Sequence, residues 1–375
     1  MSNRLSPASK YIFSERPMLV YVELTRCCDL ACQHCRAEAL LKHDPLEMNK
    51  EEAFQLLEDL KGFGEPMPHV VLTGGDPLKH PFVFDILERA KEMGIGMSLS
   101  PSATKNLTAK LFDKIKNLNV QAISLSLDGA TAETHDAFRG VPGCFEDTMR
   151  AAKLAHEAGI KIQFNTLVSE NTIDDLPQIY ERLKTIEGIM RWSVFFLISV
   201  GRGTALKELS PDKAEGVMRW LVNIGKEASF AVKTTEAPHL RRVELEKAKA
   251  NQAVMTHKQP LLLQKGYGIR DGNGILFISH QGDVYPSGFM PLKAGNIRET
   301  NIVDIYRNSE EFKLVRDPAN LTGKCGECEY RYICGGSRAR AFAATGSPVA
   351  SDPLCVYKPH KDATKRPGRR VLETA

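Results

Sequence analysis

The stretch from residue 18 to residue 225 alternates apolar, strand-like runs with amphipathic, helix-like segments, and this alternation constrains the fold most. Strands separated by helices require a parallel sheet with right-handed crossovers, which either a doubly wound sheet or a full or partial barrel satisfies. In both architectures the chemistry lies beyond the carboxyl ends of the strands. Strands are expected at 18–24, 69–72, 95–99, 122–127, 161–168 and 192–198, and helices at 50–62, 81–93, 108–118, 146–158, 173–186 and from 211.

Capping residues mark several of the expected helix ends. Asn49 followed by Glu52 is the pattern of a capping box at a helix start. Gly159 predicts the end of the fourth helix, and Ser210 before Pro211 predicts the start of the sixth.

The composition is that of an ordinary globular protein. The 375 residues include 50 Lys and Arg against 46 Asp and Glu, and a net charge of +4 does not by itself indicate nucleic-acid binding. The longest strongly apolar run, about 192–200, is far shorter than the ~20 residues of a membrane-spanning helix. The polar N-terminus lacks the apolar stretch of a signal peptide, so we expect a cytoplasmic protein without a membrane or nucleic-acid partner.

The composition and hydrophobic pattern of the chain change after the alternating region. Residues 231–265 are rich in Lys, Arg and Glu and predict a helical connector, and glycines then break short β-like runs up to residue 357. The expected divisions are an N-terminal segment 1–17, an α/β domain 18–230, the connector 231–265, a smaller domain 266–357 and a basic tail 358–375.

Eight of the nine cysteines form two groups near opposite ends of the chain. A reducing compartment argues against disulfides, so clustered thiols there indicate metal. In the first group, Cys28, Cys32 and Cys35 follow the first strand directly. Three thiolates can each hold one iron of a four-iron cluster and leave the fourth iron open. A zinc ion would need a fourth ligand, and His34 is awkwardly placed between two cysteines.

This loop resembles the CxxxCxxC signature of the radical S-adenosylmethionine (SAM) enzymes. The resemblance implies a [4Fe-4S] cluster whose open iron binds the amino and carboxylate groups of SAM. It also implies reductive cleavage of SAM to a 5′-deoxyadenosyl radical that abstracts hydrogen from a substrate. The fold it implies is an α/β partial (β/α)6 barrel of the TIM type, in agreement with the six expected strands.

Further positions match motifs of that family. Gly74, Gly75 and Asp76 follow the second strand and look like the GGE motif that holds the SAM amino group, although Asp replaces the usual Glu. Ser126, for which Ser124 is the alternative, and Arg139 are expected at the SAM ribose and carboxylate, because the guanidinium fork suits a carboxylate. Weaker candidates for contact with the adenosine are Asn165 and His34. Cys27 and Cys144 are expected to be spare thiols.

The second group comprises Cys325, Cys328, Cys334 and Cys355, four thiolates that suffice for a closed site, whether zinc or iron–sulfur. The spacing resembles the SPASM/twitch domain of radical SAM enzymes, which carries auxiliary [4Fe-4S] clusters. Full SPASM domains hold two such clusters and have cysteines where this chain has Ser287 and Arg338. The resemblance therefore implies one auxiliary [4Fe-4S] cluster.

One auxiliary cluster and the absence of an added peptide-recognition domain resemble the tetrapyrrole-modifying branch, which includes heme synthases and enzymes of heme d1 biosynthesis. The implied reaction is oxidative decarboxylation of propionates on iron-coproporphyrin III, with an external donor such as flavodoxin or ferredoxin. Lys233, His239, Arg241 and Arg242 are weak candidates for carboxylate contacts, as are His280 and Tyr285 in the second domain.

Two alternatives remain at this point. The chain is either a maturase of a ribosomally made peptide or a decarboxylase or dehydrogenase of a sugar or nucleoside. The sequence does not identify a side chain that acts directly on the substrate.

Overall fold

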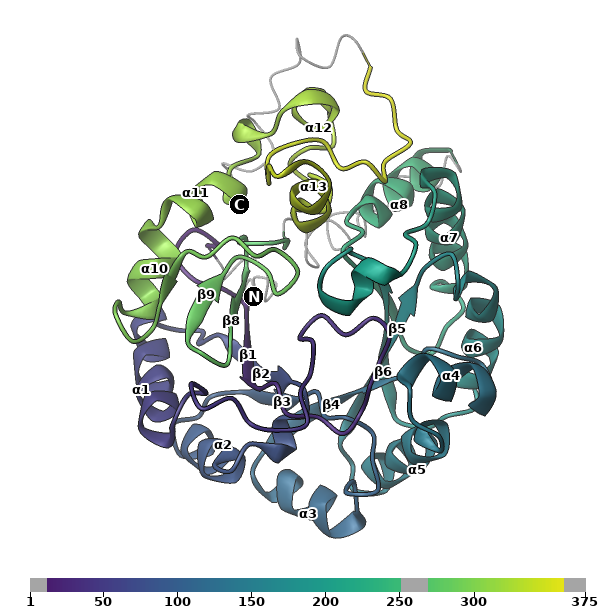
Figure 1. Ribbon diagram of the computed structural model, residues 1–375. Coiled ribbons are helices and arrows are strands. Elements are labelled where there is room, and N and C mark those ends of the chain that lie inside the picture. Colours follow the sequence, from purple (N-terminus) through teal and green to yellow (C-terminus); the bar gives the residue numbers. More distant parts are fainter. Residues whose placement is uncertain (1–11, 251–268, 361–375) are drawn as a thin grey trace, which may run out of the picture.

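A computed structural model describes residues 12–250 and 269–360 and places ten strands in one sheet. The sheet order is β10-β9-β8-β1-β2-β3-β4-β5-β6-β7, and neighbouring strands from β8 to β7 run parallel. The sheet curves into a partial barrel with its strands inside and its helices outside (Figure 1). The strands are β1 (Leu19–Thr25), β2 (His69–Gly74), β3 (Met97–Leu99), β4 (Val120–Ser126), β5 (Lys161–Val168), β6 (Ile189–Phe196), β7 (Ala231–Thr235), β8 (Ile275–Ile278), β9 (Asp283–Tyr285) and β10 (Gly295–Asn296).

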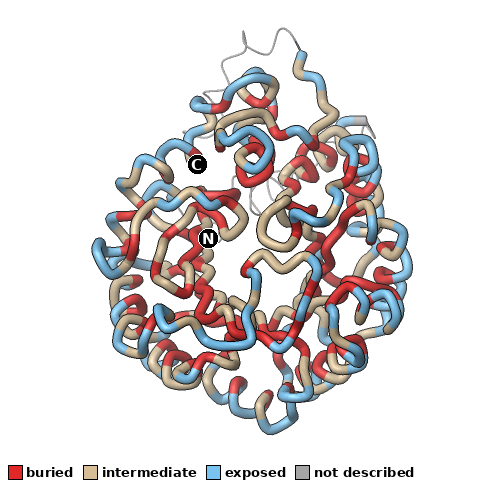
Figure 2. The backbone as a smooth tube through the Cα atoms, in the orientation of Figure 1, coloured by how far each residue is buried: buried red, intermediate tan, exposed pale blue. Residues whose placement is uncertain are grey.

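The helices form an outer ring whose inward faces pack on the strands. Figure 2 shows that the inner strands are largely buried while the outer sides of the helices are exposed. One apolar core extends between the two layers and includes Leu57, Leu87, Phe164 and Trp192. The ring consists of α1 (Lys50–Leu60), α2 (Val83–Glu92), α3 (Ala109–Asn117), α4 (Ala132–Arg139), α5 (Cys144–Glu157), α6 (Leu176–Leu183), α7 (Pro211–Ile224) and α8 (His239–Ala250), continued by α10 (Ile302–Asn308) and α11 (Glu310–Arg316).

The predicted helix ends are confirmed at three places. The Asn49 side chain accepts from the amide of Glu52 and the Glu52 side chain from that of Asn49, which completes the capping box of α1. Gly159 adopts a φ of 68° after α5, and Ser210 caps α7 ahead of Pro211. The capping residue Thr131 begins α4, a helix that the hydrophobic pattern did not indicate.

The expected connector begins with a strand and not with a helix. Residues 231–235 form β7, which pairs in parallel with β6 and extends the sheet by one strand before α8 begins. This edge strand contains Lys233, which is exposed, and two threonines, so the segment lacks the apolar run of a buried strand.

The C-terminal region continues the same sheet instead of forming a separate one. Strand β8 pairs in parallel with β1, so β8, β9 and β10 lie on the opposite edge from β7. The helices α12 (Gly323–Glu327) and α13 (Arg338–Thr345) lie in the gap between the two ends of the curved sheet (Figure 1). Residues 1–11 of the expected N-terminal segment, 251–265 of the connector and 361–375 of the basic tail lie outside the described residues. None of the helices in the described ranges is long and apolar enough to cross a membrane.

Candidate functional site

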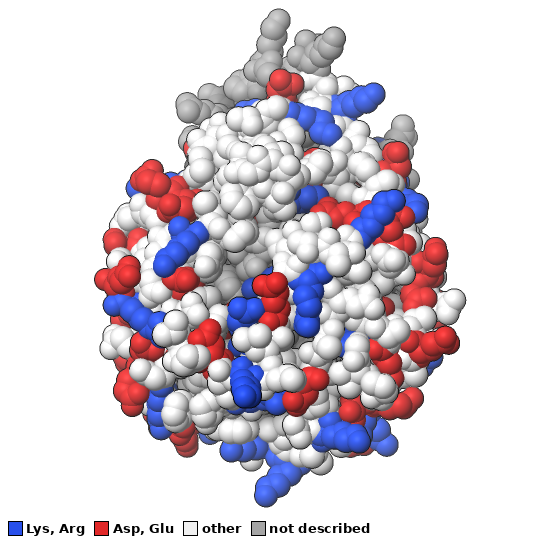
Figure 3. Space-filling view, in the orientation of Figure 1, with Lys and Arg blue, Asp and Glu red and all other residues white. Residues whose placement is uncertain are grey.

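A cavity at the carboxyl ends of the strands collects most of the residues that the sequence indicated. It encloses about 1120 Å³ including its open mouth. Figure 3 shows the molecule from the side of the loop that follows β1, with a hollow near the centre and acidic and basic side chains interspersed around it. Of the predicted residues, the cavity is lined by Cys28, Cys32, His34, Cys35, Gly74, Gly75, Ser126, Arg139 and Asn165.

The loop after β1 presents the three cysteines of the first group to this cavity. Hydrogen-bond donors already surround their sulfurs: the amide of Leu30 donates to Cys28 Sγ at 3.3 Å, and that of Ala39 to Cys35 Sγ at 3.4 Å. Burial raises the pKa of the Cys28 thiol, so a bound metal must replace its proton. Three thiols that line one cavity, two of them with amide donors to their sulfurs, suit a cluster held at three of its irons.

Arg139, at the end of α4, reaches back to the cysteine loop. Its Nη1 donates to Cys32 Sγ at 3.2 Å, and its Nε lies 3.1 Å from Oδ2 of the buried Asp128. Burial would lower the pKa of Arg139, but Asp128 and the Cys32 thiol outweigh burial and raise it. The positive charge of Arg139 therefore lies beside the sulfur of Cys32, where it would offset the negative charge of a thiolate.

The two glycines after β2 allow the chain to approach the cysteine loop closely. A Cβ on Gly74, where φ is 139°, would lie 2.2 Å from the carbonyl oxygen of Thr25, and one on Gly75 would lie 2.5 Å from that of Cys27. Asp76 does not line the cavity. Its carboxylate accepts from the amide of Leu78 at 3.1 Å, and burial raises its pKa to about 6.

The remaining predicted residues come from β4, β5 and the loop. Ser126 and Asn165 are paired across β4 and β5, and of the two β4 serines it is Ser126 that lines the cavity. The imidazole of His34 stacks on the ring of Phe138, with ring centroids 4.8 Å apart. Burial lowers the pKa of His34 to about 4, so the ring is neutral at pH 7.

The cavity also contains residues that the sequence analysis missed. Ser102, just after β3, places Oγ 3.1 Å from Cys28 Sγ. Its position after a strand end was the available signal, because the cysteine loop follows β1 and Gly75 follows β2 in the same way. Phe195 and Phe289 meet across the cavity wall with centroids 6.4 Å apart, although Phe289 follows β9 in the C-terminal region. No local pattern indicates that contact.

The two remaining cysteines lie beside the first group. Cys27 is buried, and its Sγ is 3.4 Å from the carbonyl oxygen of Leu41. Cys144, at the start of α5, packs with Cys28 and Cys32 in a small apolar cluster, and burial raises its pKa to about 11. Neither thiol lines the cavity, in keeping with the expectation of spare thiols.

A second, smaller cavity gathers the other four cysteines. Cys325, Cys328, Cys334 and Cys355 line it together, beside the side chains of His239, Arg242, Tyr330 and Tyr357. Burial raises the pKa of the Cys328 thiol to about 11 and that of Cys334 to about 12. The amide of Gly336 donates to Cys334 Sγ at 3.4 Å. These four thiols therefore line one cavity, and their number and residue type suit a four-iron cluster.

Two of the basic candidates from the connector, His239 and Arg242, line this second cavity, whereas Lys233 and Arg241 do not. Arg242 is buried between Glu215 and Glu246. Arg241 donates to the carbonyl oxygens of Ile269 and Ile333. Both guanidinium groups therefore have partners within the chain, and contact of these two weak candidates with a substrate carboxylate stays a prediction.

The two weak candidates in the C-terminal region also have partners. The His280 ring lies between two carboxylates, with Nδ1 2.8 Å from Glu23 and Nε2 3.1 Å from Asp44. The hydroxyl of Tyr285 is 3.5 Å from the Asp283 carboxylate.

Ser287 and Arg338 stand where a second auxiliary cluster would need cysteines. Ser287 Oγ donates to Oε1 of Glu236 at 3.4 Å. Arg338 is fully buried, and its Nη1 donates to the carbonyl oxygens of Pro348 and Ala350 at 3.0 and 2.7 Å. At both positions the side chain therefore makes hydrogen bonds within the protein and offers no thiol to a second auxiliary cluster.

Two family patterns match the chain. The pattern of the radical SAM superfamily matches residues 22–183, and the SPASM pattern, an iron–sulfur cluster-binding domain, matches residues 270–329. The first range covers the loop with Cys28, Cys32 and Cys35, and the second includes Cys325 and Cys328.

Known proteins resemble the chain over most of its length. An AdoMet-dependent heme synthase of Methanosarcina barkeri is 38% identical over 348 residues, which cover 92% of this chain and 98% of that protein. The pre-heme d1 synthase of Dinoroseobacter shibae is 28% identical, covering 91% of this chain and 86% of that protein. Among solved structures, Streptococcus suis SuiB bound to S-adenosylmethionine has a TM-score of 0.65 at 20% identity, covering 92% of this chain and 78% of that chain.

Proposed function

The chain belongs to the radical SAM superfamily and ends in a SPASM iron–sulfur domain, and from this premise we propose that it oxidatively decarboxylates propionate side chains of an iron tetrapyrrole. The observation that carries the proposal is the 38% identity to a heme synthase over nearly the whole of both chains. When bound, the first cluster and SAM together supply a 5′-deoxyadenosyl radical that abstracts hydrogen from the substrate.

We assign the first cluster to Cys28, Cys32 and Cys35, and the auxiliary cluster to Cys325, Cys328, Cys334 and Cys355. The backbone of Gly74 and Gly75 would face the SAM amino group, because these glycines line the cavity whereas Asp76 does not. Arg139 would bind the SAM carboxylate from its place beside Cys32. Ser126, Asn165 and the neutral His34 would contact the nucleoside.

The part of the cavity wall that follows from β6 suits a flat aromatic macrocycle. It is apolar and formed by Phe195, Phe196, Leu197 and Ile198 from the end of β6, together with Phe289. Planar rings pack well against such aromatic side chains. Arg36 adds a positive charge to the cavity lining, held by Glu23 and placed 4.5 Å from the centroid of the Phe277 ring. A propionate at the edge of a macrocycle would meet this guanidinium.

The reaction also needs an external one-electron donor for the first cluster. We propose a small redox protein of the flavodoxin or ferredoxin type, because SAM must be cleaved before the substrate radical exists. The one electron that the substrate radical releases as it loses CO2 would pass to an electron acceptor. The exposed side of the loop after β1, which includes Leu40 and Leu41, carries the carbonyl that accepts from the Cys28 amide at 2.8 Å. A donor that contacts this loop would be one hydrogen bond away from a ligand of the cluster.

Product analysis under anaerobic conditions tests this function. The reconstituted enzyme is incubated with SAM, dithionite and iron-coproporphyrin III, and the products are identified by mass spectrometry. We expect 5′-deoxyadenosine together with a porphyrin that has lost two carboxyl groups. The matched control replaces Cys28, Cys32 and Cys35 by Ala and should form neither product. Formation of 5′-deoxyadenosine with unchanged porphyrin, or conversion of a precursor peptide instead, would reject the tetrapyrrole assignment.

A further inference from the structure

We propose that Arg340 is a positioning residue that couples two sites. One is the auxiliary cluster site, the smaller cavity lined by Cys325, Cys328, Cys334 and Cys355. The other is the β6 wall of the larger cavity at the carboxyl ends of the strands, which we call the SAM cavity. Arg340 lies in α13, six residues after the cluster-site residue Cys334, and is only 1% exposed. A buried guanidinium needs partners for all of its donors. The partners of Arg340 come from both sites, and this distinguishes it from Arg338 of the same helix.

On the barrel side, Arg340 holds the end of β6. Its Nη2 donates to the carbonyl oxygens of Phe196 and Leu197 at 3.3 and 3.0 Å. Both residues line the SAM cavity. Its Nε donates to Oε2 of Glu208 at 3.0 Å, and Oε1 of Glu208 accepts from the amide and hydroxyl of Ser199. The guanidinium therefore holds the backbone of this cavity wall directly at residues 196 and 197, and the adjoining residue 199 through Glu208.

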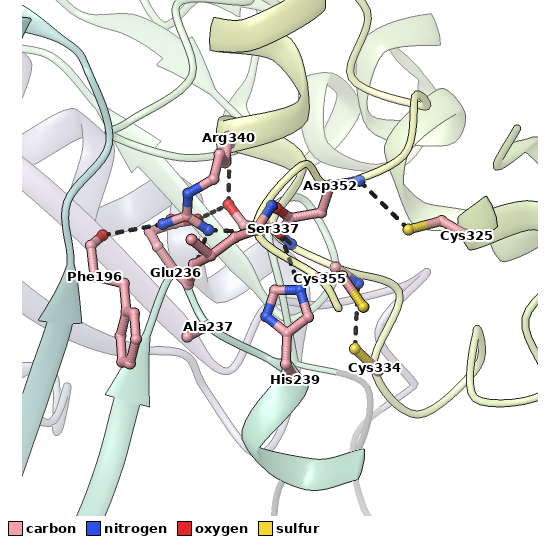
Figure 4. A network of polar contacts seen from close by, with 12 residues as sticks. Phe196, Glu236, Ala237, His239, Cys325, Cys334, Ser337, Arg340, Asp352 and Cys355 are labelled. Carbon is pink, nitrogen blue, oxygen red and sulfur yellow. Dashed lines mark hydrogen bonds and ion pairs between the residues drawn. The ribbon is translucent and has the colours of Figure 1, made fainter. Parts of the chain in front are cut away.

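On the auxiliary side, Arg340 contacts the segment that carries a cluster ligand. Its Nη1 lies 3.5 Å from Oδ2 of the fully buried Asp352, and the Asp352 amide lies 3.5 Å from Cys325 Sγ. Figure 4 shows this chain of contacts from Phe196 through Arg340 and Asp352 to Cys325. Two residues, Arg340 and Asp352, thus connect a sulfur of the auxiliary site with the wall of the SAM cavity.

The same helix supplies a natural control. Arg338 is equally buried, and its Nη2 lies 3.8 Å from Cys325 Sγ, yet its other side-chain hydrogen bonds go to the carbonyl oxygens of Gly336, Pro348 and Ala350. All of these partners belong to the auxiliary region. Arg338 therefore supports the cluster site alone, whereas Arg340 joins that site to the barrel.

Coupling of this kind is reciprocal, so SAM binding in the barrel should change the auxiliary cluster. The test measures the midpoint potential of the auxiliary cluster in the holoenzyme, with and without SAM, by redox titration followed by electron paramagnetic resonance. It is made on the wild type, Arg340→Lys and Arg338→Lys. We expect SAM to shift the potential in the wild type and in Arg338→Lys, and we expect Arg340→Lys to lose at least half of the shift.

Three outcomes would overturn the proposal: no SAM-dependent shift in the wild type, a full shift in Arg340→Lys, or an equal loss in both variants. If Arg340→Lys does not fold, Glu208→Gln replaces it, because it removes the charge that holds Arg340 to the barrel and leaves the auxiliary side intact. Its shift should be smaller than that of the wild type, and a full shift would overturn the proposal. The inference rests on the two cluster assignments and not on the tetrapyrrole, so it stands or fails independently of the substrate.

Discussion

Arg139 donates a hydrogen bond to the sulfur of Cys32 at 3.2 Å while Asp128 holds its other side. The arginine thus contacts the cysteine loop directly, in addition to the SAM carboxylate contact that we propose for it. Hydrogen bonds from charged donors to a cluster sulfur stabilise the thiolate and tune the cluster's reduction potential. One side chain therefore connects the geometry of the cluster site with that of the SAM site.

Replacement of Arg139 by Lys should lower the rate of SAM cleavage by about 10- to 100-fold, because a charge-assisted, forked interaction of ~1.5–3 kcal/mol is lost. The measurement is 5′-deoxyadenosine formation with dithionite, alongside the iron content. Arg150→Lys is the matched control, since Arg150 likewise has a carboxylate partner, together with two carbonyl oxygens, but lies outside the cavity lining. Equal rates in the two variants would contradict the role of Arg139.

Replacement of Gly75 by Ala should weaken SAM binding by at least about tenfold. The new Cβ would lie within 2.6 Å of the carbonyl oxygens of Arg26 and Cys27, so the backbone beside the cysteine loop must move. Gly216→Ala is the control, because a Cβ there meets nothing within 4 Å in the middle of α7. That substitution should raise stability by ~0.5–1 kcal/mol and leave SAM binding unchanged. Isothermal titration with SAM under anaerobic conditions separates the two results.

Replacement of both Cys325 and Cys328 by Ala should remove the auxiliary cluster and about half of the iron, since each site holds four irons. Substrate-free SAM cleavage should continue, because the barrel site keeps its own three cysteines. Iron and sulfide analysis measures the loss of the cluster, and formation of 5′-deoxyadenosine measures SAM cleavage. Wild-type iron content in the double variant would refute the assignment of the second cavity.

The ion pairs of His280 predict a pH dependence of stability. Burial would lower the pKa of His280, but Glu23 and Asp44 outweigh burial and raise it above 6.5. A raised pKa stabilises the fold fully below about 6.5, and this contribution is lost as the pH rises through the folded-state pKa. The pKa of Glu23 is lowered to about 2, since Arg36 and His280 outweigh burial, so the contribution of Glu23 is lost only as the pH falls from 4.5 toward about 2.

The two residues together therefore stabilise the docking of the β8–β9 turn on β1 most between pH 4.5 and 6.5. The melting temperature of the wild type should fall relative to that of His280→Gln between pH 6 and pH 9. A difference in melting temperature between the wild type and His280→Gln that stays constant from pH 6 to pH 9 would show that His280 does not titrate as described.

The strand-and-helix alternation predicted the parallel α/β architecture because each buried strand is a local apolar run. β7 was missed because an edge strand needs no such run. The site residues that follow strand ends could be found from the sequence, since parallel strands bring their carboxyl ends together. Phe289 and Arg340 could not, because their roles arise from contacts with β6, which lies 93 or more positions earlier in the chain.

Deuterium transfer from the substrate tests the central claim most directly. The enzyme is supplied with iron-coproporphyrin III deuterated on the propionate side chains, and the 5′-deoxyadenosine formed is analysed by mass spectrometry. If the radical abstracts hydrogen from a propionate, each carboxyl group lost from the porphyrin should be accompanied by one molecule of 5′-deoxyadenosine that carries one deuterium atom. Unlabelled 5′-deoxyadenosine and a porphyrin that keeps all of its carboxyl groups would contradict the assignment of the tetrapyrrole as the substrate.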